Sequence, residues 1–139
     1  MSFFDDSLRN RIVETLGDRD FVLAYETSAD FLFVCNQDPH RLNLTVYCLE
    51  DFNLDGVECI VVDSYDNIEI VDQNGIRCTS PRQTIIDLLR NDRNQTTTVE
   101  CVAWWWHRHN YDFSTIDIPD DIREEYESYF EDAMDYYRH

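Results

Sequence analysis

Carboxylates are the most numerous ionisable side chains of this chain. The sequence holds 29 Asp and Glu against 11 basic residues, all of them Arg, for a formal net charge of −18 at pH 7. A field of this sign repels phosphate and attracts basic protein surfaces. We therefore expect a basic nucleic-acid-binding protein as the partner, with no direct nucleic acid and no membrane. The alternative is that the acids only maintain solubility, for which a net charge of roughly 2–8 usually suffices.

These carboxylates gather in two blocks along the chain. Residues 30–76 carry a net charge of −9 and residues 112–139 carry −8, while residues 77–111 carry +2 and residues 1–29 carry −3. If the two acidic blocks share one face of the fold, they form a single negative patch of several kT.

The second block predicts one amphipathic helix after Pro119. Its apolar face would carry Ile122, Tyr126, Tyr129, Phe130, Ala133 and Tyr137. Carboxylates near the end of a helix repel one another and oppose its dipole, which suggests that they have a use. The predicted partner-binding residues are Asp120, Asp121, Glu124, Glu127, Glu131, Asp135, Asp63, Asp66, Trp104 and Trp105.

The run of three tryptophans cannot be buried on one helix face. Periodicity assigns Trp106 to the core, so that Trp104 or Trp105 is partly exposed and could anchor a protein partner. Stacking on single-stranded bases and packing against the last helix are the two alternatives.

Catalytic and metal-binding patterns are weak. Cys101, His107 and His109 are the thiol–imidazole group, but histidines two residues apart point away from each other on a helix and no third ligand is evident. Asp18 and Asp20 lack the Gly-Ser that precedes a nucleotidyltransferase metal pair, and three glycines leave no phosphate-binding loop. We expect a protein without enzymatic activity, cofactor or metal.

The elements that must position these residues indicate an α+β fold in a single domain, residues 1–139, with a small mixed or antiparallel β-sheet and four to five helices. Strands are expected over residues 21–25, 42–47, 57–62, 68–71 and 76–78. Helices are expected over residues 5–16, from a cap at Thr27 or Ser28 to residue 33, over 81–91, from 97 to 106, and after 119. Residues 72–75 predict a tight turn, and residues 111–118 an extended segment.

Two helix starts have sequence signatures. Ser80 is expected to cap a helix that has Pro81 in its first position, and Gln83 would complete a capping box. Thr97 and Glu100 form a second such pair, following a polar loop over residues 91–98.

The cysteines and the chain start bear on location. The five cysteines are odd in number and widely spaced without C-x-x-C, which favours reduced thiols in a core. No apolar stretch approaches the roughly 20 residues that span a bilayer, and residues 1–6 do not resemble a signal peptide. We expect a soluble protein of the bacterial cytoplasm.

The segment GIRCTSPRQTIIDLL, residues 75–89, resembles the signature of the AbiEi-type antitoxin domain, in which a short strand runs into a Thr-Ser-Pro turn and a helix. Ser28-Ala29 and residues 40–47, 57–62 and 68–71 resemble further elements, so the resemblance covers about residues 22–90. Arg82-Gln83 stand where the family has Glu-Arg. About twenty residues precede the region, too few for the family's winged-helix DNA-binding domain.

The resemblance implies an antitoxin-like core over residues 22–90 without its operator-binding half, followed by a C-terminal helical part over residues 97–139. Such a module would neutralise a nucleotidyltransferase toxin. From size and charge we predict instead an acidic inhibitor of the anti-CRISPR or anti-restriction type, in which carboxylates mimic nucleic acid and block a DNA- or RNA-binding surface. The antitoxin-like function is the alternative.

Overall fold

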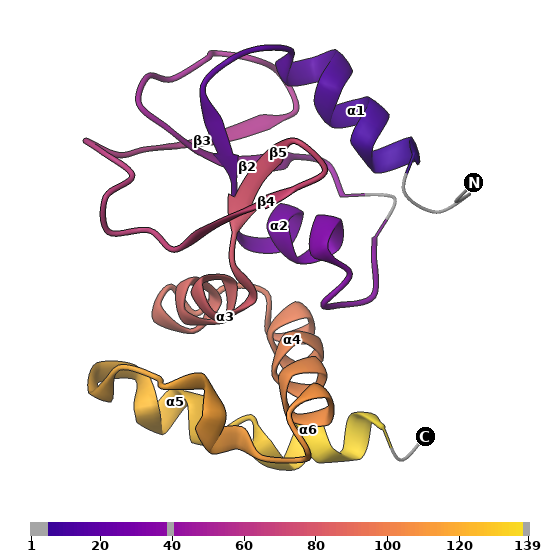
Figure 1. Ribbon diagram of the computed structural model, residues 1–139, viewed down its shortest axis with the longest axis vertical. Helices are drawn as coiled ribbons and strands as arrows, with labels where there is room; N and C mark the ends of the chain where they lie inside the picture. The colour runs from indigo at the N-terminus through magenta and orange to yellow at the C-terminus, as the bar shows by residue number, and fades with distance from the viewer. Residues whose placement is uncertain (1–5, 39–40, 138–139) are drawn as a thin grey trace.

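The computed structural model describes residues 6–38 and 41–137 and has the predicted α+β fold with a mixed sheet. The predicted helix start at residue 5 and position 40 of the resemblance lie outside the described residues. Figure 1 shows the sheet and α1 at one end of the long axis, α5 and α6 at the other, and α3 and α4 between them. The strands are β1 (Phe21–Leu23), β2 (Leu44–Cys48), β3 (Val57–Val61), β4 (Ile70–Gln73) and β5 (Ile76–Thr79).

The described residues form six α-helices, one more than the sequence pattern suggested. They are α1 (Asp6–Leu16), α2 (Tyr25–Leu32), α3 (Pro81–Arg90), α4 (Gln95–Arg108), α5 (Arg123–Glu127) and α6 (Phe130–Tyr136), with 3-10 helices η1 (Phe113–Ile116) and η2 (Asp120–Ile122). Within the described ranges, no helix has the length and apolar character needed to cross a bilayer.

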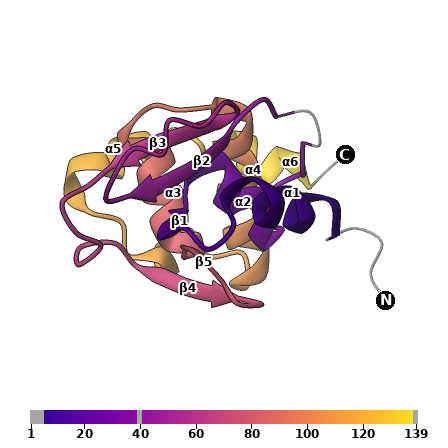
Figure 2. The same cartoon turned by 90° about the horizontal axis from the view of Figure 1, so that it is seen from above.

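The sheet has the strand order β3-β2-β1-β5-β4, which Figure 2 shows from above. The outer pair β2 and β3 is parallel, as is the β1–β5 pair, while β1–β2 and β4–β5 are antiparallel. The predicted turn joins β4 to β5: Asn74 and Gly75 both have positive φ, and the Asp72 carboxylate accepts a hydrogen bond from the Gly75 amide at 2.8 Å.

Both faces of the sheet are covered, which corrects the prediction of a half-buried strand over residues 42–47. Phe21 and Leu23 of β1 pack in one cluster with Ile12 of α1, whereas Val22 packs in the other with Ile85 of α3. All five residues of β2 are accordingly buried, and Leu42 lies outside the strand and is exposed. Each fully buried aliphatic side chain contributes about 1.5–3 kcal/mol.

The first helix cap was predicted wrongly. The strand β1 ends at Leu23 and α2 begins at Tyr25, so Thr27 and Ser28 lie inside the helix. Their hydroxyls serve the sheet instead: Thr27 Oγ1 accepts a hydrogen bond from the Thr45 amide at 2.8 Å, and Ser28 Oγ donates to the Thr79 carbonyl at 2.9 Å. Tertiary partners have displaced the local capping function of these two residues.

The start of α3 confirms the Ser80 cap and corrects the capping box. Ser80 Oγ accepts a hydrogen bond from the Gln83 amide at 3.0 Å, and Pro81 occupies the first turn. The Gln83 side chain instead donates to Asp87 at 2.9 Å, and the Ser80 amide donates to the Glu69 carbonyl at 2.9 Å. The second predicted box is replaced outright, because Asn94 caps α4 by accepting from the Thr97 amide at 3.1 Å.

The C-terminal part differs most from the sequence prediction. Within the segment predicted to be extended, η1 forms under an Asp112 cap. The single last helix is divided into η2, α5 and α6, with Ser128 and Tyr129 between the two α-helices. Ile122, Tyr126 and Ala133 are buried as predicted, whereas Tyr137 is exposed.

Arginine side chains join the elements of this fold. Arg93, in the α3–α4 turn, forms ion pairs with Glu26 of α2 at 2.9 Å and with Glu58 of β3, and its guanidinium lies 4.6 Å from the Tyr25 ring centroid. Arg41 pairs with the buried Asp30 of α2 at 2.5 Å. These contacts hold α2 against the sheet and α4.

Three more arginines connect the outer parts of the molecule. Arg77 pairs with Asp20 beside β1 at 2.5 Å. From α3, Arg82 donates to the Ile116 carbonyl of η1 at 2.9 Å, and Arg90 pairs with Asp121 of η2 at 2.8 Å. The C-terminal part is therefore tied to α3 by arginines as well as by the core.

Replacing Arg93 by Gln should destabilise the protein by about 2–3 kcal/mol, because two largely buried or half-buried carboxylates lose their partner. Arg90→Gln is the matched control, since its pair with Asp121 is exposed and should contribute at most about 1 kcal/mol. Urea unfolding of both variants measures the difference, and equal losses would contradict the central position of Arg93.

The buried Asp87 carboxylate predicts a pH dependence. It accepts hydrogen bonds from Tyr47 at 2.8 Å and Gln83 at 2.9 Å, but burial outweighs them and raises the pKa of Asp87. The folded state therefore binds this proton more tightly than the unfolded state. Its stabilising contribution is complete below the unfolded pKa and is lost as the pH rises through the folded pKa.

Asp87→Asn removes this titration. The stability of the wild type relative to Asp87→Asn should decline as the pH rises above about 4, the ordinary pKa of Asp, as determined by chemical unfolding at each pH. Parallel stability curves for the two proteins would show that Asp87 does not titrate differently on folding.

Candidate functional site

The exposed carboxylates of η2, α5 and α6 form the surface that we call the C-terminal acidic surface. It consists of Asp120, Asp121, Glu124, Glu125, Glu127, Glu131 and Asp132. Five of the residues predicted to bind a partner lie here. The sixth acid predicted in this block, Asp135, is half-buried.

Most of this negative charge has no basic partner. Arg90 pairs with Asp121 and Arg123 pairs with Asp120 at 3.2 Å, both in exposed positions. Within the described ranges the other five carboxylates of the surface form no ion pair. Carboxylates without a basic partner raise the local negative potential, which is the condition for attracting a cationic protein.

The other predicted acids lie elsewhere. Asp63 and Asp66 are exposed in the loop between β3 and β4. This loop and α5 lie on the same side of the molecule in Figures 1 and 2, and α3 lies between them in Figure 1. The connection between β2 and β3, with more exposed acids, lies at the α1 end of the long axis. The exposed acids of the first block are thus spread over different parts of the molecule, and this loop is the part of them that lies on the side of α5.

The three tryptophans of α4 are all half-buried, so the assignment of Trp106 to the core was too strong. Trp106 stacks on Phe113 with ring centroids 5.6 Å apart. The Trp105 indole donates to Thr115 Oγ1 at 2.7 Å, and its ring stacks on His109 at 4.1 Å. Trp104 packs against the core cluster that contains Val22 and Ile85, and the Arg108 guanidinium lies over its ring. Intramolecular contacts thus engage Trp104 and Trp105, and their role as partner anchors stays a prediction.

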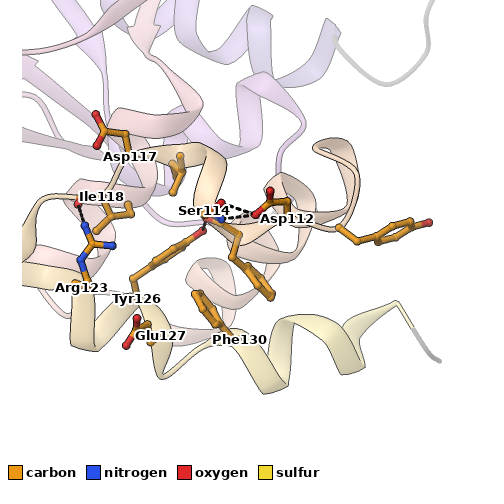
Figure 3. A pocket seen from close by; sticks show the side chains of 11 residues that line it. Asp112, Ser114, Asp117, Ile118, Arg123, Tyr126, Glu127 and Phe130 are labelled. Atoms are coloured by element: carbon orange, nitrogen blue, oxygen red, sulfur yellow. Dashed lines mark hydrogen bonds between the residues drawn. The ribbon is translucent and has the colours of Figure 1, made fainter.

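A cavity of about 440 Å³ opens between η1 and α5, beside the acidic surface (Figure 3), and we call it the aromatic groove. Its lining residues are Tyr111, Asp112, Phe113, Ser114, Ile116, Asp117, Ile118, Arg123, Tyr126, Glu127 and Phe130.

Aromatic rings line the groove where η1 packs against α5 and α6. The Phe113 ring stacks on Phe130 with centroids 3.9 Å apart, and Tyr126 meets Phe130 edge to face at 4.9 Å. The buried Tyr126 hydroxyl donates to the Phe113 carbonyl at 2.6 Å, which fixes η1 over α5. Tyr111 remains 62% exposed at the groove.

Three carboxylates and one guanidinium also line the groove. Asp112 accepts hydrogen bonds from the Ser114 hydroxyl at 2.6 Å and amide at 2.8 Å, and these bonds lower the pKa of Asp112. Asp117 and Glu127 are exposed. Arg123 is engaged with the Ile118 carbonyl at 2.9 Å and with Asp120. The lining is net negative and suits a cation.

The candidate catalytic groups are not assembled. Cys101 lies in the core, while the rings of His107 and His109 stack on Tyr137 at 4.5 Å and on Trp105. Asp20 is occupied by Arg77. In the described part of the chain, no group of three or more His, Cys, Asp or Glu side chains could hold a metal ion.

Comparison with known protein families and with curated proteins found no match to this chain.

Sequence reasoning missed Asp112, Phe113 and Asp117 because it predicted an extended segment there. The available signal was Asp112 two residues before Ser114, a pattern in which the carboxylate can cap a short turn. The stacking of Phe113 on Phe130 has no counterpart in local sequence periodicity.

The five thiols are free, and burial predicts that most of them are unreactive. Cys48, Cys78 and Cys101 are buried, and burial raises the pKa of Cys78 to about 11. Iodoacetamide at neutral pH should leave these three unmodified in the native protein and modify all five in urea, as measured by peptide mass spectrometry. Rapid native labelling of Cys101 would revive the nucleophile hypothesis.

Proposed function

We propose that this protein is a non-enzymatic inhibitor that binds a basic nucleic-acid-handling protein and covers the surface on which that protein holds DNA or RNA. The C-terminal acidic surface is the observation that carries the proposal. Its five carboxylates without an ion pair among the described residues lie next to a net-negative aromatic groove. The targets we propose are CRISPR effectors and restriction enzymes of the bacterial cytoplasm.

The charge density of this surface supports nucleic-acid mimicry. Seven carboxylates lie within residues 120–132. Five of them belong to η2 and α5 and two to the start of α6. Double-stranded DNA is also densely charged, with one negative charge per about 1.7 Å of its axis, counting both strands. A surface that neutralises phosphates with Arg and Lys would meet a dense group of carboxylates here.

An antitoxin-like module is the second proposal, with a nucleotidyltransferase toxin as its target. The support is local: β5 runs through Thr79, the Ser80 cap and Pro81 into α3, in the order that the resemblance to AbiEi-type antitoxins implies. Both proposals require an acidic binding surface, and they differ in the protein that is inhibited.

The experiment reverses three charges at once. Glu124→Lys, Glu127→Lys and Glu131→Lys together should weaken inhibition of the target at least tenfold, because attraction becomes repulsion. A matched variant reverses the exposed Glu14, Asp18 and Glu50 at the other end of the molecule and should change inhibition less than threefold. Inhibition is measured on CRISPR nucleases, restriction enzymes and nucleotidyltransferase toxins.

Salt provides the second criterion. Raising the ionic strength from about 0.05 M to 0.5 M should weaken the complex and slow its association, since screening shortens the range of the attraction. Circular dichroism of both triple variants confirms that they are folded. Unchanged inhibition by the α5–α6 variant, or a complex indifferent to salt, would contradict the proposal.

A further inference from the structure

Resting on the proposed function, we infer that the aromatic groove receives an arginine side chain of the protein partner. The acidic surface attracts a cationic protein at long range, and the groove would then hold one of its guanidinium groups. The groove has the volume of a ligand site, about 440 Å³, and joins the acidic surface through Glu127.

The aromatic lining offers a flat cation an exposed ring at Tyr111. Phe113 stacks on both Trp106 and Phe130, and Tyr126 is buried, so these rings form the apolar wall of the groove. A guanidinium stacks on an exposed aromatic face and is more weakly hydrated than the ammonium of lysine, so that it loses less on leaving water.

Carboxylates surround these rings. In Figure 3, Asp112, Asp117 and Glu127 lie around Tyr126 and Phe130, on different sides of them. They come from three places in the fold: the η1 cap, the residue after η1, and the end of α5. A guanidinium has five N–H donors in one plane and can therefore donate to one of these carboxylates while its face rests on a ring, and the other two add to the negative potential.

The chain itself shows this arrangement once already. Arg93 lies over the Tyr25 ring while it bonds Glu26 and Glu58. The groove presents the same kinds of group, an aromatic ring and carboxylates. Its own guanidinium, Arg123, is directed to the Ile118 carbonyl and to Asp120.

The test compares two sets of substitutions that each remove three negative charges. The groove set is Asp112→Asn, Asp117→Asn and Glu127→Gln; Asn at 112 keeps the oxygen that caps η1, and Asn tolerates the positive φ of position 117. The surface set is Glu124→Gln, Glu131→Gln and Asp132→Asn, whose side chains are exposed and do not line the groove.

Fluorescein-labelled nona-arginine and nona-lysine are the probes, titrated by anisotropy at about 0.15 M salt. The wild type should bind nona-arginine at least fivefold more tightly than nona-lysine. The groove set should weaken nona-arginine binding at least tenfold and abolish the preference, while the surface set should weaken both peptides about two- to threefold. Phe130→Leu, which leaves the charge unchanged, should reduce the preference for arginine.

Each other outcome overturns the inference. Equal weakening by the two sets would show that the groove is not special and would leave the acidic surface as the binding site. Equal affinity for the two peptides, or no binding of nona-arginine, would exclude a guanidinium site. If neither set weakens binding and salt has no effect, the proposed function fails as well. Urea unfolding of each variant confirms that the loss of affinity is not a loss of fold.

Discussion

Arg93, in the α3–α4 turn, contacts two further elements at once: Glu26 and the Tyr25 ring of α2, and Glu58 of β3. The arrangement of the fold depends on this kind of contact. Arg41 holds α2 through Asp30, and α3 is connected to the C-terminal part through Arg82 and Arg90. The core supplies most of the free energy of folding, and the arginines add contacts between elements that the core already brings together.

This use of arginine has an electrostatic consequence. The chain has 11 basic residues for 29 acidic ones, and several of the basic residues are engaged between elements. Few remain to neutralise the outside, and the C-terminal acidic surface keeps most of its charge. The same contacts that assemble the fold thus leave the carboxylates uncompensated where a cationic partner can reach them.

The sequence predicted elements whose signals are local. The Asn74-Gly75 turn and the Ser80 cap before Pro81 were predicted because backbone conformation and capping depend on adjacent residues. The predicted helix start at Thr27, the predicted cap at Thr97 and the prediction of an unbroken last helix were wrong. Tertiary hydrogen bonds and side-chain packing compete with local preferences at these places. The acids were found from composition alone, but the groove depends on Phe113 stacking on Phe130 with η2 and α5 between them in the chain, a contact that no periodicity describes.

The division of the last helix has a further consequence. The α5 helix has five residues and α6 has seven, whereas isolated helices shorter than about 12–15 residues are marginal in water. Their helical shape therefore derives from Tyr126 and Ala133 docking onto the rest of the protein. A synthetic peptide with the sequence of this segment would carry the same formal charge. It would be a flexible chain, however, and would lack the spatial order of the carboxylates.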